Sequence, residues 1–206
     1  MPPLMRPAVV LAAVVLLSAC QPEPEAKYPA DLNACELLPR EAARRITDVG
    51  PSLGPAEEKT WNVIVTYKYC QWSYKQPREH FWSSYRKGPV KRTLTVRAQI
   101  TPAKSGGATA VAVQYDGHLD SERQAGHTVQ EVPGIGEDAM VSTRTDSDGR
   151  QSTQVIFRRS NALITVGLYG EDCCAGQSRE IDMRAANRRE IVLAVAKVTD
   201  HSLLSR

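Results

Sequence analysis

The segment at residues 93–100 constrains the fold more than any other part of the chain. Its apolar side chains alternate with polar neighbours, at Leu94, Val96, Ala98 and Ile100. This period of two is typical of a β-strand that has one apolar face and one polar face. We therefore expect a half-buried strand here.

Further strands are indicated by β-branched and aromatic residues and by the turn signals between them. Residues 61–74 are rich in Val, Ile, Thr, Tyr and Trp, and they predict one or two strands after a loop at 50–59. A meander is expected from strands at 140–145, 152–157 and 163–169, with turns at Asp148–Gly149 and at Ser160–Asn161.

Three helices are predicted from apolar residues spaced three and four apart. They cover residues 35–46 with Pro39 in the first turn, residues 108–119, and residues 178–199 with Ser178 as the cap and Ile181 on the apolar face. This order predicts an α+β fold, in which an antiparallel sheet of about five to six strands carries an N-terminal, a middle and a C-terminal helix.

The start of the chain has the features of a secretory signal. Arg6 precedes an apolar run at residues 8–17, which is about half the length needed to span a bilayer. The run ends in Leu17, Ser18, Ala19 and Cys20. This ending resembles the bacterial lipobox, which implies that the Cys20 thiol receives a diacylglyceryl group before cleavage.

These features predict three segments. Residues 1–19 are expected to be a lipoprotein signal peptide, residues 20–31 a lipidated cysteine with a Pro-rich tether, and residues 32–206 one globular domain. The expected location is the extracytoplasmic face of the cell membrane, and the membrane is the expected partner of the anchor. The net charge is only +3 and both signs are interspersed, so no nucleic-acid partner is expected.

The other four cysteines lie in the part of the chain that is expected to be exported. Outside the cytoplasm such cysteines usually pair, and four of them allow three connectivities. We expect a disulfide between Cys35 and Cys70, which would close a loop of about 35 residues. Cys173 and Cys174 are adjacent, so a vicinal disulfide, two free thiols or exchange with the first pair all stay open.

Several short motifs together resemble one known family. They are the lipobox Cys20, the helix opening Ala34 to Leu38, the strand residues Cys70, Gln71 and Trp72, the segment Val132 to Ala139, and the strand into Tyr169. The chain resembles the actinobacterial lipoproteins of domain of unknown function 3558. The resemblance implies paired Cys35 and Cys70 and a small fold similar to the Mog1 and PsbP type, and it implies no known activity.

No motif predicts a catalytic residue, a metal or a cofactor. Gly134, Gly136 and Ala139 fit a loosened dinucleotide fingerprint, but strand-like residues follow them where a helix is needed, so a tight turn is favoured. No two histidines are three or four residues apart, and no serine lies at the spacing of a nucleophile elbow.

The aromatic residues gather at positions 61–85, and this suggests a binding surface. Trp72 is expected in the core, whereas a connection further on combines aromatic and basic side chains, namely His80, Phe81, Trp82, Tyr85, Arg86 and Lys87. The predicted function is a lipid-anchored, non-enzymatic accessory or binding module of the cell envelope, with an envelope protein, lipid or glycan as ligand. The alternative is an envelope hydrolase or a thiol-redox protein that uses Cys173 and Cys174.

Overall fold

A computed structural model describes residues 26–47, 57–62, 66–75, 88–145, 151–173, 181–182 and 185–206. In chain order the elements are η2 (Ala34–Glu36), α1 (Arg40–Ile46), β1 (Glu57–Asn62), β2 (Thr66–Lys75), β3 (Gly88–Ile100), η5 (Ala103–Ser105), α2 (Gly107–Gln124), β4 (Thr128–Glu131), β5 (Asp138–Thr145), β6 (Gln151–Arg159), β7 (Ala162–Cys173), β8 (Ile181–Asp182) and α3 (Ala185–Leu204).

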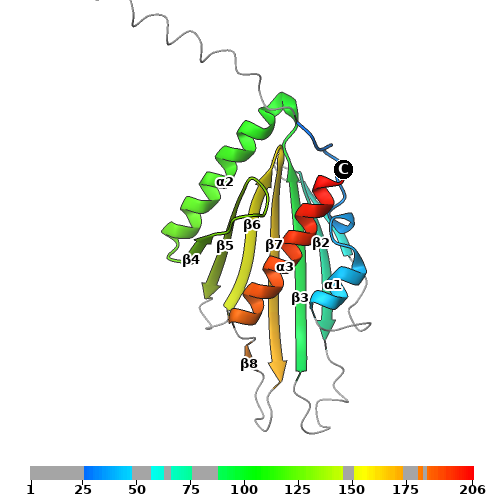
Figure 1. The fold of residues 1–206 in the computed structure, drawn as a ribbon, viewed down its shortest axis with the longest axis vertical. Helices are drawn as coiled ribbons and strands as arrows, with labels where there is room; N and C mark the ends of the chain where they lie inside the picture. The colour runs from blue at the N-terminus through cyan, green and yellow to red at the C-terminus, as the bar shows by residue number, and fades with distance from the viewer. Residues whose placement is uncertain are drawn as a thin grey trace, which may run out of the picture.

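The expected α+β architecture is confirmed (Figure 1). One antiparallel sheet has the order β1-β2-β3-β7-β6-β5-β4, and the two-residue β8 pairs with β7. The short strands β1, β4 and β8 bring the described sheet to eight strands, above the five or six that the pattern predicted. The N-terminal, middle and C-terminal helices are all present.

Helices α1 and α3 pack on one face of the sheet, and they cover its larger core. The alternating residues of β3 that were expected to be apolar lie in this core. Trp72 is fully buried in the same core, as predicted. Val192, Val195 and Ala196 of α3 complete it.

Helix α2 packs on the opposite face, against a smaller core. Val111 and Tyr115 of α2 meet Met140, Ile156 and Leu163 of the sheet. Ile156 and Leu163 precede Phe157 and Ile164, which belong to the larger core. Since neighbouring residues of a strand point to opposite faces, the two cores lie on the two sides of one sheet.

Several element boundaries differ from the prediction. Ile181 was placed on the C-terminal helix, but it lies in β8, and α3 begins at Ala185. The expected loop at 50–59 already contains the first residues of β1, and β4 was not expected. The predicted N-terminal helix is divided into η2 and α1, because Pro39 has an extended conformation and begins a new helix.

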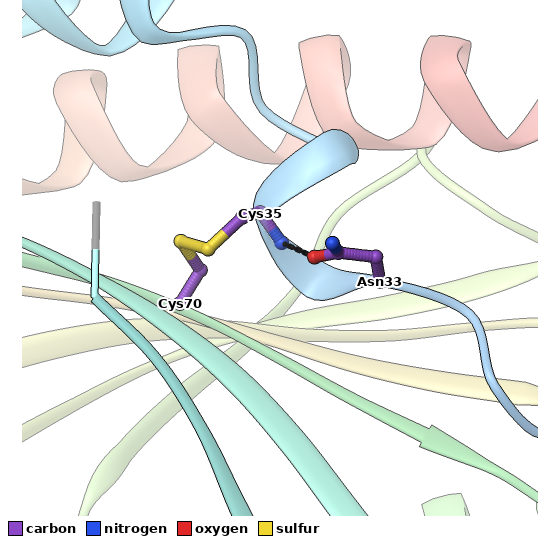
Figure 2. Close-up of a disulfide and its surroundings, with 3 residues drawn as sticks. All are labelled: Asn33, Cys35 and Cys70. Atoms are coloured by element: carbon purple, nitrogen blue, oxygen red, sulfur yellow. Dashed lines mark hydrogen bonds between the residues drawn. A yellow bond between two sulfur atoms is a disulfide. The ribbon is translucent and has the colours of Figure 1, made fainter. Parts of the chain in front are cut away.

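The predicted disulfide between Cys35 and Cys70 is confirmed (Figure 2). It links η2 to β2, and Cys70 is fully buried. The side-chain oxygen of Asn33 accepts a hydrogen bond from the Cys35 amide at 2.8 Å, which caps η2. The disulfide therefore fastens the N-terminal segment to the sheet.

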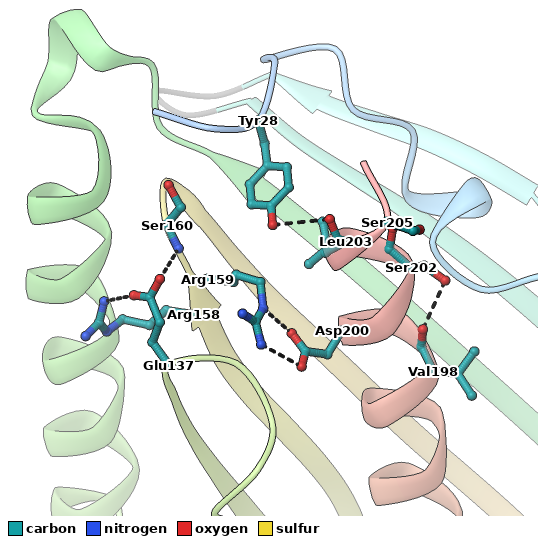
Figure 3. A network of polar contacts seen from close by, with 10 residues as sticks. All are labelled: Tyr28, Glu137, Arg158, Arg159, Ser160, Val198, Asp200, Ser202, Leu203 and Ser205. Atoms are coloured by element: carbon teal, nitrogen blue, oxygen red, sulfur yellow. Dashed lines mark hydrogen bonds and ion pairs between the residues drawn. The ribbon is translucent and has the colours of Figure 1, made fainter. Parts of the chain in front are cut away.

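The N-terminal segment is also fastened at the end of the β6–β7 hairpin. The Tyr28 amide donates to Asn161 Oδ1 at 2.8 Å, and the Asn161 side-chain amide donates to the Tyr28 and Thr101 carbonyls. The Tyr28 hydroxyl donates to the Leu203 carbonyl of α3 (Figure 3). Tyr28 thus already packs against the domain, although it lies within residues 20–31, which were expected to form the tether.

Ion pairs hold the same end of the fold together. Arg159 of β6 pairs with Asp200 of α3, and both side chains are largely buried (Figure 3). Arg158 pairs with Glu137, whose other oxygen accepts from the Ser160 amide. Together these contacts join the hairpin to α3 and to the turn before β5.

That turn is the one predicted from the glycine-containing motif. Gly134 and Gly136 have positive φ angles of 79° and 61°, and β5 follows directly. A Cβ on Gly136 would lie 2.4 Å from the Arg158 carbonyl oxygen, so only glycine fits there. A tight turn that leads into a strand is therefore confirmed.

Other predicted features lie outside the described residues. These are Cys20, the aromatic and basic connection from His80 to Lys87, the Asp148–Gly149 turn, Ser178 and Cys174. Cys173 is the last residue of β7, and its side chain is not described. Within the described ranges no helix combines the length and the hydropathy needed to cross a bilayer.

Candidate ligand-binding site

A cavity of about 610 Å³ lies on the polar face of the sheet. Its lining comes from five strands: Tyr67 and Tyr69 from β2, Thr95 and Arg97 from β3, Thr165 and Gly167 from β7, Gln154 from β6, and Arg144 from β5. Each of these residues lies one or three positions from a residue of the same strand that is buried in the larger core, and therefore faces away from that core. Strand alternation places all of them on the face that carries α2.

The cavity exists because α2 covers only part of this face. The helix packs on Met140, Ile156 and Leu163, and the sheet continues beyond them toward β2. Gly167 leaves the floor of the cavity open, because it has no side chain that would lie over Thr95 of the neighbouring strand. A Cβ at this position would approach Thr95 Oγ1 to 2.9 Å.

The rim beside α2 is fixed by a buried carboxylate. Glu122, in the last turn of α2, is 4% exposed. It accepts hydrogen bonds from Ser142 Oγ at 2.6 Å and from Gln154 Nε2 at 3.1 Å, and it pairs with the Arg144 guanidinium. His127 Nδ1 lies 2.9 Å from the same carboxylate.

These partners lower the pKa of Glu122. Burial by itself raises the pKa of a carboxyl, but the hydrogen bonds from Arg144, Ser142 and His127 outweigh burial and bring the pKa to about 2. Glu122 is therefore ionised at neutral pH, and its charge balances that of Arg144. The cluster ties the end of α2 to β5 and β6.

Arg97 has a different environment. Its guanidinium carbon lies 5.3 Å from the centre of the Tyr67 ring, and Nη2 is 3.5 Å from Thr165 Oγ1. Among the described residues no carboxylate forms an ion pair with it. The described lining therefore contains two arginines, and the carboxylate beside it, Glu122, is already engaged by Arg144.

Polar residues of α2 border the same region. Gln114 Oε1 accepts a hydrogen bond from Gln99 Nε2 at 2.6 Å, on the strand that carries Arg97. His118 follows one turn later, and burial together with the charge of Arg97 lowers its pKa. His118 is thus neutral near pH 7, and it adds no positive charge to the two arginines.

A second, smaller hollow of about 380 Å³ lies between α2 and the turn before β5. Asp116, Glu131, Glu137 and Asp138 line it. Arg158 pairs with both Glu137 and Asp138, and Arg123 pairs with Glu131. In the described part of the chain, no group of three or more His, Cys, Asp or Glu side chains could hold a metal ion.

The sequence did not predict this cavity. Tyr67 and Tyr69 belong to the aromatic-rich segment that suggested a binding surface, but the expected surface was its later part at 80–87. Arg97 and Thr95 are polar partners of the alternating pattern, and the pattern gave no sign that they border a cavity. Comparison of the chain with protein-family models, with curated proteins and with solved structures finds no match.

Proposed function

We propose that this protein is a non-enzymatic binding module of the cell envelope, anchored through a lipid on Cys20, and that the cavity on the polar face of the sheet holds its ligand. The observation that carries the second part is the cavity itself. Its volume of about 610 Å³ falls in the range of sites for small molecules.

The lining supports binding more than catalysis. It offers two phenol groups, two guanidinium groups, two threonine hydroxyls and one amide, and these groups can orient a ligand through stacking and hydrogen bonds. The threonine and tyrosine hydroxyls of the lining have no carboxylate or histidine among the eight described lining residues to activate them as nucleophiles.

A variant that fills the cavity tests this function. Thr95→Trp places an indole over the floor, where the native side chain makes only a long hydrogen bond to the Gly167 carbonyl at 3.4 Å. Full-length ¹⁵N-labelled protein in a neutral detergent would be titrated with a set of small polar and aromatic fragments and followed by NMR. We expect some fragments to shift amide signals of β2, β3 and β7, and we expect Thr95→Trp to abolish these shifts.

Val113→Trp is the matched control, because Val113 is 67% exposed on α2 and is not part of the cavity lining. This control should bind the same fragments as the unchanged protein. If no fragment shifts the cavity amides, or if both tryptophan variants bind alike, the cavity is not the ligand site.

The anchor is tested separately. Cys20→Ser in the full chain removes the thiol that the lipid would occupy, so the variant should leave the membrane fraction. Mass spectrometry of the unchanged protein should find acyl chains on Cys20. A Cys20→Ser variant that stays in the membrane fraction, or an unmodified cysteine in the natural protein, would show that the domain is held in another way.

A further inference from the structure

We infer that the ligand of the cavity carries an anionic group, a carboxylate or a phosphate, joined to a ring. This inference rests on the proposed binding function and specifies its ligand class. The anionic group is assigned to Arg97, and the ring to the two tyrosines of β2.

The charge balance of the cavity is the first argument. Glu122 is the carboxylate next to this face, and it is saturated by Arg144, Ser142 and Gln154. It does not compete for Arg97, which has the Tyr67 ring and the Thr165 hydroxyl as its described contacts. A half-buried guanidinium without a carboxylate partner binds an anion favourably, because charge-assisted hydrogen bonds gain strength where water is partly excluded.

The geometry of the donors is the second argument. Arg97 pairs in register with Tyr69 on β2 and with Thr165 on β7, so a ring and a hydroxyl flank the guanidinium on its own row of the sheet. The face of Tyr67 supports the guanidinium plane, which limits its rotation. A planar fork held in one orientation matches the two oxygens of a carboxylate or a phosphate.

Arg144 adds a second donor on the far side of the cavity. Its Nε and Nη2 bind Glu122, and its side chain is 42% exposed. Nη1 makes no hydrogen bond to any described residue and is left to serve a ligand oxygen. Since Arg144 is already neutralised by Glu122, we assign the main recognition of charge to Arg97.

The ring is assigned from the spacing of the tyrosines. Tyr67 and Tyr69 are two residues apart on one strand, so they lie on the same face, and both line the cavity. Both rings line the cavity beside the cation, and one face of Tyr67 carries the Arg97 guanidinium. A ring on the ligand would lie against the phenol carbons that border the cavity, which a small inorganic anion would not contact.

Matched probes test the inference. Full-length ¹⁵N-labelled protein in a neutral detergent would be titrated with benzoate against benzamide, and with phenyl phosphate against phenol. The two anions should bind at the cavity at least about tenfold more tightly than their neutral partners, because a hydrogen bond to a charged group is stronger than one to a neutral group. Glycerol phosphate, which has the anion of a phospholipid head without a ring, should bind more weakly than phenyl phosphate.

Two variants assign the effect to Arg97. Arg97→Gln should remove the preference for the anions, and Arg97→Lys should keep part of it. Arg123→Gln is the control, since Arg123 is 54% exposed and faces Glu131, yet it removes the same charge from the protein. Its preference for anions should be unchanged.

The possible failures are distinct. If the neutral probes bind as tightly as the anions, or if Arg97→Gln keeps the preference, the anionic ligand is refuted while the cavity remains a binding site. If glycerol phosphate binds as well as phenyl phosphate, the ring is refuted. If no fragment of any kind shifts the cavity amides, the proposed binding function itself fails.

Discussion

Replacing Glu122 with glutamine tests whether the buried carboxylate holds α2 to the sheet. The pKa of Glu122 falls from an ordinary 4.5 to about 2, and this difference corresponds to about 3 kcal/mol of stability. Because the pKa is lowered in the folded state, this contribution is fully present above pH 4.5. It is lost as the pH falls toward 2.

The expected result is therefore a difference that depends on pH. Glu122→Gln should lower the free energy of unfolding by about 3 kcal/mol at pH 7 and by roughly half as much at pH 3. Urea unfolding followed by tryptophan fluorescence at the two pH values measures it. All other carboxylates are present in both proteins, so the difference between their free energies of unfolding reports on Glu122 alone.

Glu131→Gln provides the control for this experiment. The Glu131 side chain is 74% exposed and lies 3.5 Å from Arg123, so its loss should cost less than about 1 kcal/mol at either pH. The reasoning is refuted if Glu122→Gln is as mild as this control at pH 7. It is also refuted if the cost of Glu122→Gln is the same at pH 3 and pH 7.

Three further substitutions probe the rest of the fold by urea unfolding. Cys35→Ser combined with Cys70→Ser should cost about 3 to 4 kcal/mol, and a reductant should lower the stability of the unchanged protein to the same level. Asn161→Ala should cost about 3 kcal/mol, because the side chain is fully buried and serves three backbone groups, and limited proteolysis should then remove the N-terminal segment faster. Gly136→Ala should cost at least about 2 kcal/mol and Gly126→Ala clearly less, because both have positive φ but the Cβ meets a backbone atom only in the first case.

The architecture could be predicted because the sequence alternates clearly where the sheet is half-buried. The β3 pattern and the confirmed burial of Trp72 follow from one face of the sheet being apolar. The disulfide could be expected once export was inferred, because Cys35 and Cys70 each lie beside a predicted element. These features depend on local sequence and on general chemistry.

The start of α3 could not be predicted, since Ile181 fits two patterns. It has helical spacing to the apolar residues after it, yet it pairs with Asp172 of β7 as part of β8. Strand β4 was missed for a related reason: it lies at the edge of the sheet, and three of its four residues are exposed, so it has little apolar alternation. In both places the structure is decided by pairing with a distant strand, which local sequence propensity cannot predict.

The cavity could be predicted only in part. Since Trp72 faces the core, strand alternation already places Tyr67 and Tyr69 on the other face, away from it. What the sequence does not contain is how far α2 extends over that face. This depends on where the Glu122 cluster fixes the helix, and hence on contacts between residues that are 20 or more positions apart.

The arginines of the sheet differ in their partners, and this separates stability from binding. Arg159 is 19% exposed and pairs with Asp200, so Arg159→Gln leaves a largely buried carboxylate without its partner and should cost about 3 kcal/mol. Arg97 has no carboxylate partner among the described residues, so Arg97→Gln should change the free energy of unfolding by less than about 1 kcal/mol. Urea unfolding of the two variants measures this contrast. A large loss of stability in Arg97→Gln would mean that Arg97 supports the fold, and the unpaired charge would then no longer argue for a ligand.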